Sequence, residues 1–373
     1  MKPALTVAHA AGAYPVYIAP GILTDLPGLA RRHFGDRRSA LIADSTVAGL
    51  YRAFLRGDNT AWRLAGRTCS DETAAGWAPL EFPAGESSKS RTTWQGLTDS
   101  LLDQRFGRDA ALVALGGGVT GDLVGFVAAT YLRGIPLLQA PTTLLAMLDS
   151  SIGGKVGVDT RHGKNLVGAF HPPVAVVADP LTLGTLPDRD FRGGLAEAVK
   201  HGLMADERHL AWLEENAGAV LRRDPDALSS LIGASVAIKA DVVAGDEREG
   251  GRRAILNAGH TVAHALEQAT NYAMPHGEAV AIGLVMECAL GESLGVTAPG
   301  TRARIESLLL RLGLPVQPPD SVSARELVEL MGTDKKGRGG SVGFAFAAQP
   351  GRTAEGWVTQ VSPADLRGAL EEG

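Results

Sequence analysis

Histidine and glutamate side chains recur at helical spacing in the second half of the chain. The segment His260-Thr-Val-Ala-His264 places two imidazoles four residues apart, on one face of a helix. A third imidazole, His276, begins the next apolar segment, and Glu197 stands in an upstream helical segment. Position 261 is threonine, which excludes the H-E-x-x-H signature of metalloproteases. One carboxylate with two imidazoles is a common catalytic zinc set with an open coordination position. Taken alone, an H-x-x-x-H pair is more often structural or solvated.

A glycine-rich turn follows an apolar segment in the first half. The run Gly116-Gly-Gly-Val-Thr-Gly-Asp122 satisfies G-x-G-x-x-G at Gly116, Gly118 and Gly121. Such glycines let the backbone approach a pyrophosphate at a helix N-terminus. The run lies well inside the chain, and no acidic residue follows about 20 positions later, so the Rossmann pattern is only partly met. Asp44, which ends an earlier strand, is the candidate ribose partner. The alternative interpretation is a tight strand-to-helix turn.

Several lysines stand among small and apolar residues. Lys155, Lys164, Lys200 and Lys239 are flanked by Gly, Ala and Val rather than by other charges. A single lysine is most often a solvated charge. Gathered cations in an acidic protein predict a pocket for an anion, and hence a substrate that carries phosphate or carboxylate.

The composition limits the classes of protein to which the chain can belong. With 373 residues and roughly 150 residues per domain, two domains are expected. The apolar fraction of 45% and charged fraction of 21% are those of a globular protein. A net charge of −5 argues against nucleic-acid or polybasic membrane partners. Two cysteines far apart exclude a disulfide framework and favour a cytoplasmic location. We expect neither a secretory leader nor a membrane span, since no 18-residue stretch is both apolar and uncharged.

The hydrophobic period changes near residue 180 and divides the chain into two predicted domains. Domain 1–180 alternates apolar strands with amphipathic segments, which predicts an α/β fold with a mainly parallel sheet. Domain 181–373 shows a helical period and is predicted to be all-α. The predicted strands are 14–18, 39–43, 112–115, 137–140 and 174–178, and the predicted helices are 193–204, 207–217, 225–244, 259–271, 277–294 and 302–312. A short hairpin is expected from segments 342–347 and 357–361.

Taken together, these motifs resemble the 3-dehydroquinate synthase family of sugar phosphate cyclases. The resemblance implies a Rossmann-like NAD-binding α/β domain, an all-helical metal- and substrate-binding domain, an active site between them, and a homodimer that uses NAD and one zinc or cobalt ion. It covers most of the chain, in order. The matching segments are Phe82-Pro-Ala-Gly-Glu-Ser-Ser-Lys89, Gly116 to Asp122, Pro141-Thr-Thr143, Asp149-Ser-Ser-Ile-Gly-Gly-Lys155, Gly163-Lys-Asn165, Gly193 to Lys200, Asn257-Ala-Gly-His260, His276-Gly-Glu278 and Asp334-Lys-Lys336.

The resemblance also implies a role for individual residues. The implied metal ligands are Glu197, His260 and His276. The implied NAD-binding residues are Asp44, Gly85, Glu86, Lys89, Gly117, Gly118, Val119, Gly121, Asp122, Thr142, Thr143, Lys155, Lys164, Thr182, Leu183, Gly184 and Thr185. The implied catalytic and substrate-binding residues are Asp149, Lys155, Asn165, Lys200, Lys239, Glu249, Arg253, Asn257, His264 and Lys336, with Arg133 reaching the site of the neighbouring subunit. His264 and Glu249 are the candidates for moving protons.

The implied reaction converts 3-deoxy-D-arabino-heptulosonate 7-phosphate into 3-dehydroquinate and phosphate, the second step of the shikimate pathway. Sister cyclases that make 2-deoxy-scyllo-inosose or valiolone skeletons usually differ around the lysine that matches Lys155, where this chain reads as the dehydroquinate type. A glycerol-dehydrogenase-like oxidoreductase is the alternative among enzymes. A third interpretation is a regulatory module that binds a nucleotide or metal without catalysis.

Overall fold

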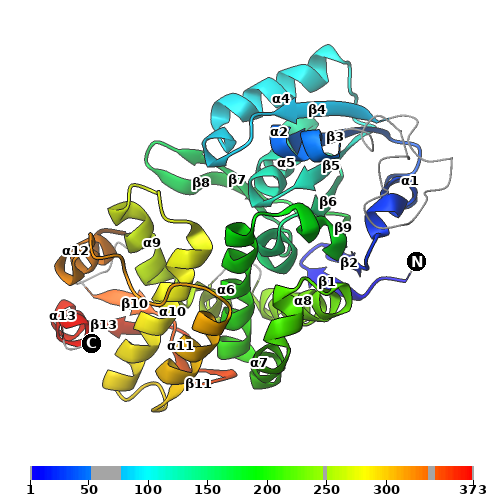
Figure 1. The fold of residues 1–373 in the computed structure, drawn as a ribbon. Coiled ribbons are helices and arrows are strands. Elements are labelled where there is room, and N and C mark those ends of the chain that lie inside the picture. The colour runs from blue at the N-terminus through cyan, green and yellow to red at the C-terminus, as the bar shows by residue number, and fades with distance from the viewer. Residues whose placement is uncertain (1, 52–76, 247–249, 335–340, 372–373) are drawn as a thin grey trace. The chain divides into compact units, whose positions relative to one another are not determined.

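The computed structural model of the chain describes residues 2–51, 77–246, 250–334 and 341–371 (Figure 1). These residues form two compact units. The first comprises Met1–Leu186 with Leu228–Val236, and the second comprises Pro187–Ala227 with Ala237–Gly373. The first unit contains the main sheet and the second is largely helical, so the expected fold class is confirmed.

A seven-stranded sheet organises the first unit. Its order is β1-β2-β9-β6-β5-β3-β4, and every neighbouring pair is parallel except β1 with β2. The strands are β1 (Leu5–His9), β2 (Gly12–Ile18), β3 (Arg38–Asp44), β4 (Ala78–Phe82), β5 (Ala110–Gly116), β6 (Leu137–Pro141) and β9 (Ala175–Ala178). The predicted strands correspond to β2, β3, β5, β6 and β9.

Successive side chains of the central strands point to opposite faces of the sheet and pack into two apolar cores, one on each face. Leu41 of β3 packs with helices α1 (Leu26–Phe34) and α2 (Ser45–Leu50). Ile42, the next residue of that strand, packs with α4 (Arg91–Asp103) and α5 (Gly118–Thr130). An antiparallel hairpin of β7 (Lys155–Thr160) and β8 (Gly163–Phe170) joins the second core through Val156 and Val158. The sequence did not predict this hairpin.

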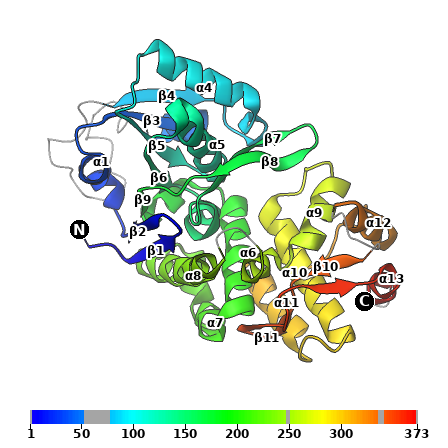
Figure 2. The same ribbon diagram turned by 180° about the vertical axis from the view of Figure 1, so that it is seen from behind.

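In the second unit, helix α10 (His276–Ser293) packs against α6 (Asp188–Ala205), α9 (His260–Ala269) and α11 (Thr301–Arg311) (Figure 2). Helices α7 (Glu207–Leu221), α12 (Ala324–Asp334) and α13 (Pro363–Glu371) also belong to this unit. The expected hairpin forms from β10 (Val342–Phe344) and β13 (Thr359–Val361), and a second pair joins β11 (Ala347–Gln349) to β12 (Arg352–Thr353). The expectation of an all-helical half is therefore wrong in detail, because the backbone groups of the tail pair as short strands.

Helix α8 (Pro225–Gly245) is, among the described residues, the one helix that is long and apolar enough to cross a membrane by length and composition. Its most apolar window has a mean hydropathy of 1.6, and half of that window is buried. Leu228, Leu231 and Ile232 are fully buried. Such burial is typical of the core helix of a globular unit.

Candidate metal centre and nucleotide-binding turn

Three side chains from three helices bring their ligand atoms together in the helical unit. Glu197 of α6, His260 of α9 and His276 of α10 offer atoms that all lie within 4.8 Å of one another. Oε1 of Glu197 is 3.7 Å from Nε2 of His260 and 3.8 Å from Nε2 of His276. These separations are too long for strong hydrogen bonds. They are close to the roughly 3.4 Å between two ligands that share a tetrahedral zinc ion. The three predicted ligands therefore fit a divalent metal.

The other ring nitrogen of each imidazole, Nδ1, lies close to an oxygen atom of the protein. Nδ1 of His260 lies 3.1 Å from the carbonyl oxygen of Ala258, and Nδ1 of His276 lies 3.5 Å from Oε1 of Glu267. Metal-binding histidines usually contact a carbonyl or carboxylate in this way, which directs the other nitrogen to the ion. Sequence reasoning missed Glu267. The available signal was its position on the His260–His264 helix, three residues after His264.

The electrostatics of the two imidazoles differ. Burial holds the pKa of His260 well below its usual value, and the positive charge of Lys200 lowers it further. His260 is then neutral near pH 7, which is the form that binds metals. Burial also lowers the pKa of His276, but the hydrogen bond to Glu267 and the charge of Glu197 outweigh this effect and raise it. Lys200 forms an ion pair with Oε2 of Glu197, and both side chains are buried.

The remaining predicted residues of the helical unit have varied environments. Lys239 and Arg253 are buried, which is unusual for cations and is consistent with a role in binding an anion. Asn257 is partly buried. His264 is exposed, and its ring lies edge-on to His260 at 5.7 Å between centroids. Glu249 and Lys336 lie outside the described residues.

The glycine run of the first unit forms the turn from β5 into α5. Gly116 ends β5, and Gly117 is the N-cap of α5, with no side chain capping the helix. A Cβ atom at Gly117 would approach Thr143 to 3.0 Å, and one at Gly118 would approach Ser150 to 3.1 Å. The backbone N–H groups at this terminus suit a pyrophosphate, because helix N-termini attract anions. Val119 is partly buried, and a Cβ at Gly121 would lie 2.6 Å from Oε1 of Gln139, so Gly121 permits close packing of α5 on β6.

Charged residues near this turn interact with one another. Nζ of Lys89 forms a 2.6 Å ion pair with Asp122. Burial raises the pKa of Glu86, although the charges of Lys89 and Lys164 oppose the shift. Asp159 also faces Glu86, and its carboxylate accepts a 2.8 Å hydrogen bond from the backbone N–H of Asn165. The structure therefore links five predicted residues, Glu86, Lys89, Asp122, Lys164 and Asn165, and it adds Asp159, which the sequence did not single out.

Other residues predicted to contact the nucleotide form hydrogen bonds with nearby backbone groups in turns and helix ends. Oδ1 of Asp44 caps α2 by accepting hydrogen bonds from the backbone of Thr46 and Val47. Oγ1 of Thr143 accepts one from the N–H of Ala146, and Thr182 donates its hydroxyl to Asp179. A role for these groups toward a nucleotide stays a prediction.

The other predicted residues of the first unit occupy turns and the β7–β8 hairpin. Thr142 and Leu183 are buried, whereas Gly184 is exposed. Asp149 lies in a single π-helical turn, Ala146–Ser150. Lys155 begins β7, and Asn165 lies in β8 with a left-handed φ of 56°. Gly85 has a φ of 107°, Thr185 donates its hydroxyl to Thr182, and Arg133 is exposed.

The α/β unit and the helical unit with its Glu–His–His cluster define an enzyme built on the sugar phosphate cyclase fold. The chain belongs to the 3-dehydroquinate synthase family. The family model "3-dehydroquinate synthase N-terminal" matches residues 79–193, and "3-dehydroquinate synthase C-terminal" matches residues 194–337. The 3-dehydroquinate synthase of Symbiobacterium thermophilum is 45% identical over 360 residues, which cover 96% of this chain and 97% of that protein.

Solved structures agree with this assignment. A 2-deoxy-scyllo-inosose synthase, in complex with carbaglucose-6-phosphate, NAD+ and Co2+, is 25% identical and has a TM-score of 0.86, with 99% of each chain covered. The 2-epi-5-epi-valiolone synthase of Streptomyces hygroscopicus subsp. jinggangensis, with NAD+ and Zn2+ bound, is 28% identical and has a TM-score of 0.83, with 98% of each chain covered. A probable glycerol dehydrogenase from Sinorhizobium meliloti is 16% identical over 96% of this chain and 95% of its own, with a TM-score of 0.64, and shares the fold alone.

Proposed function

We propose that this enzyme converts 3-deoxy-D-arabino-heptulosonate 7-phosphate into 3-dehydroquinate and phosphate. The observation that carries the proposal is a difference in sequence identity to two kinds of enzyme, each compared over nearly the whole chain. The chain is 45% identical to a 3-dehydroquinate synthase, but only 25% and 28% identical to the two sister cyclases. The alternative, a glycerol-dehydrogenase-like oxidoreductase, is supported only by a shared fold at 16% sequence identity. A shared fold does not imply a shared reaction.

We propose NAD and one divalent metal as cofactors. The Glu–His–His cluster suits the ion, and the uncapped N-terminus of α5 suits the pyrophosphate of NAD. The related structures contain NAD+ with Co2+ or Zn2+. When bound, the ion supplies Lewis-acid stabilisation of negative charge on substrate oxygens, and NAD supplies reversible hydride acceptance.

The chain's own cations supply the electrostatics of the reaction. Lys200, Lys239 and Arg253 are buried in the helical unit, where a positive charge acts more strongly than in water. We assign them to the phosphate and carboxylate of the substrate. Positive charges held in place by burial are prearranged to stabilise the negative charge that develops during phosphate elimination.

His264 is proposed to move protons without binding the metal. We expect His264→Ala to keep the metal and to lose about 100-fold or more in kcat, the usual contribution of a general acid or base. His260→Ala, one turn away on α9, should lose both metal and activity. Metal analysis of the two purified variants, with their steady-state rates, checks this pair. An unchanged rate in metal-replete His264→Ala contradicts the assignment.

A phosphate-release assay on the heptulosonate phosphate tests the reaction itself. With catalytic NAD, we expect many molecules of phosphate per NAD and a constant total of NAD, because the hydride is returned in each turnover. Chelation of the metal should abolish release, and added Zn2+ or Co2+ should restore it. Accumulation of NADH in proportion to product would instead support a dehydrogenase, and absence of turnover with metal and NAD present would support a binding module.

We also propose that the enzyme is a homodimer and that it is located in the cytoplasm. Arg133 is exposed and has a left-handed φ of 71°, next to Leu132 at 48°. Such backbone strain in consecutive residues is typical of functional sites, and it supports a contact of Arg133 with the neighbouring subunit. The buried free thiol of Cys288 is compatible with a reducing compartment.

A further inference from the structure

Helix α9 begins at the metal ligand His260 without a cap from its own N-cap residue. That residue is Gly259, in a left-handed conformation with a φ of 79°, and it has no side chain to accept hydrogen bonds. The first backbone N–H groups of a helix have no partner within the helix. A buried helix terminus therefore requires an acceptor from elsewhere.

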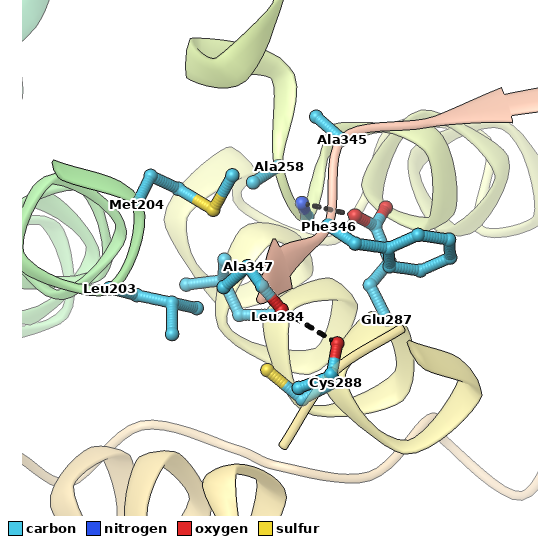
Figure 3. A pocket seen from close by; sticks show the side chains of 11 residues that line it. Leu203, Met204, Ala258, Leu284, Glu287, Cys288, Ala345, Phe346 and Ala347 are labelled. Atoms are coloured by element: carbon cyan, nitrogen blue, oxygen red, sulfur yellow. Dashed lines mark hydrogen bonds between the residues drawn. The ribbon is translucent and has the colours of Figure 1, made fainter. Parts of the chain in front are cut away.

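Glu287 of α10 supplies this acceptor. Its Oε2 accepts a 2.7 Å hydrogen bond from the backbone N–H of Gly259, and its Oε1 lies 3.4 Å from the N–H of Val262. Glu287 is only 4% exposed. Figure 3 shows its carboxylate beside Phe346 and Ala258, with the shorter bond dashed. A carboxylate at a helix N-terminus also interacts favourably with the helix dipole.

These hydrogen bonds hold a buried carboxylate in largely apolar surroundings. The small pocket beside it is lined mainly by apolar side chains, including Leu203, Met204, Leu284 and Phe346. A carboxylate in such surroundings is costly unless hydrogen-bond donors hold it. The two backbone N–H groups of the α9 terminus are donors of this kind.

The same few residues fix the ring of His260. Its Nδ1 contacts the carbonyl oxygen of Ala258, one residue before the Gly259 N–H that Glu287 holds. The backbone also approaches α10 closely here, because a Cβ atom at Gly283 would lie 2.0 Å from the carbonyl oxygen of Gly259. The segment that aims Nε2 of His260 at Glu197 is thus anchored on α10.

We propose that Glu287 is a positioning residue that holds His260 in the geometry of a metal ligand. This inference rests on the proposed metal site. Glu287 acts through the backbone of α9, and its oxygens are not among the clustered ligand atoms. Its loss should therefore weaken metal binding without removing a ligand.

The chain offers a matched control on the same helix. Helix α11 also begins after a left-handed glycine without a side-chain cap, Gly300. Oε1 of Glu292, also on α10, accepts a 2.7 Å hydrogen bond from the N–H of Arg302 in that helix. No proposed site residue lies on α11. Glu292→Gln therefore makes the same change, from carboxylate to amide, at the same kind of helix cap but at a distance from the proposed metal ligands.

The experiment compares Co2+ binding by the wild type, Glu287→Gln and Glu292→Gln after metal removal. Affinity is measured by competition with a chromophoric chelator, together with the visible spectrum of bound Co2+ and the Tm. We expect Glu287→Gln to lose about 10- to 100-fold in Co2+ affinity, as for outer partners of metal ligands, and to change the spectrum. Glu292→Gln should lower the Tm but keep the affinity and spectrum.

The outcomes distinguish a failure of the positioning role of Glu287 from a failure of the proposed metal site. Wild-type affinity and spectrum in Glu287→Gln would overturn the positioning role. Equal losses in both variants would also overturn it, because they would reflect general destabilisation. Absence of Co2+ binding by the wild type would reject the metal site itself. If Glu287→Gln does not fold, Glu287→Asp keeps the charge on a shorter side chain and is judged by the same comparison.

Discussion

Replacing Glu197 with glutamine should abolish metal binding and reduce the rate by about 1,000-fold or more. The variant keeps the shape of the side chain but removes the only carboxylate of the Glu–His–His cluster. A Lewis-acid ion contributes several kcal/mol to stabilising developing charge, and about 1.4 kcal/mol corresponds to a factor of ten in rate. Metal content after dialysis and phosphate release under saturating NAD measure the two effects.

Glu197→Gln has a second consequence that must be separated from the first. Lys200 is buried and pairs with Glu197, so the variant leaves a buried ammonium without its counter-charge. Breaking a buried pair in this way costs about 3–5 kcal/mol, whereas replacing both partners is often nearly neutral. We therefore expect Glu197→Gln to lower the Tm, and Glu197→Gln/Lys200→Met to recover it without recovering metal.

The control for charge removal is Glu215→Gln on α7, where the side chain is exposed. It should match the wild type in metal content, rate and Tm. A metal-replete Glu197→Gln, or a double variant that regains metal together with stability, would show that Glu197 is not a ligand. The metal centre would then have to be rebuilt from other residues.

The sequence predicted the parts of the fold that local patterns encode. Strands β5 and β6 are buried on both faces and appear as short apolar runs ending in Gly or Pro. Strand β4 is at the edge of the sheet and contains Pro79 and Glu81, so its pattern is weak. The β7–β8 hairpin is rich in glycine and polar residues, which in sequence are typical of a loop.

Some relations within the candidate site are visible in the sequence, and others arise only from the packing of separate helices. His260 and His264 stand four residues apart on one helix, so their relation is visible in the sequence. The contacts of Glu267 with His276 and of Glu287 with Gly259 join separate helices or their ends. No local pattern specifies such contacts. Positioning residues therefore emerge only when the helices are packed.

Gly277→Ala is expected to separate two helices that carry the proposed metal ligands. Gly277 of α10 follows His276, and Gly193 of α6 precedes Glu197 by one turn. A Cβ atom at Gly277 would lie 2.2 to 2.4 Å from the backbone of Gly193. The backbone of a helix cannot change rotamer as a flexible side chain can. The two helices must therefore move apart.

The expected loss in stability is about 1–3 kcal/mol or more, the usual cost of overpacking a core. The expected loss in metal affinity arises because a displacement of about 1 Å is enough to disable a preorganised site. Urea unfolding of the metal-free variant measures the first quantity, and Co2+ titration well below its Tm measures the second. Added Zn2+ should raise the Tm of Gly277→Ala less than that of the wild type, since ligands that bind the native state stabilise it according to their affinity.

The matched control is Gly332→Ala in α12, where a Cβ atom would meet nothing within 4 Å. Because alanine favours helix over glycine, this variant should be more stable by about 0.5–1 kcal/mol and should bind metal normally. If Gly277→Ala behaved like Gly332→Ala, the contact between Gly193 and Gly277 would not set the spacing of Glu197 and His276. If Gly277→Ala lost stability but kept full metal affinity, the contact would matter for packing alone.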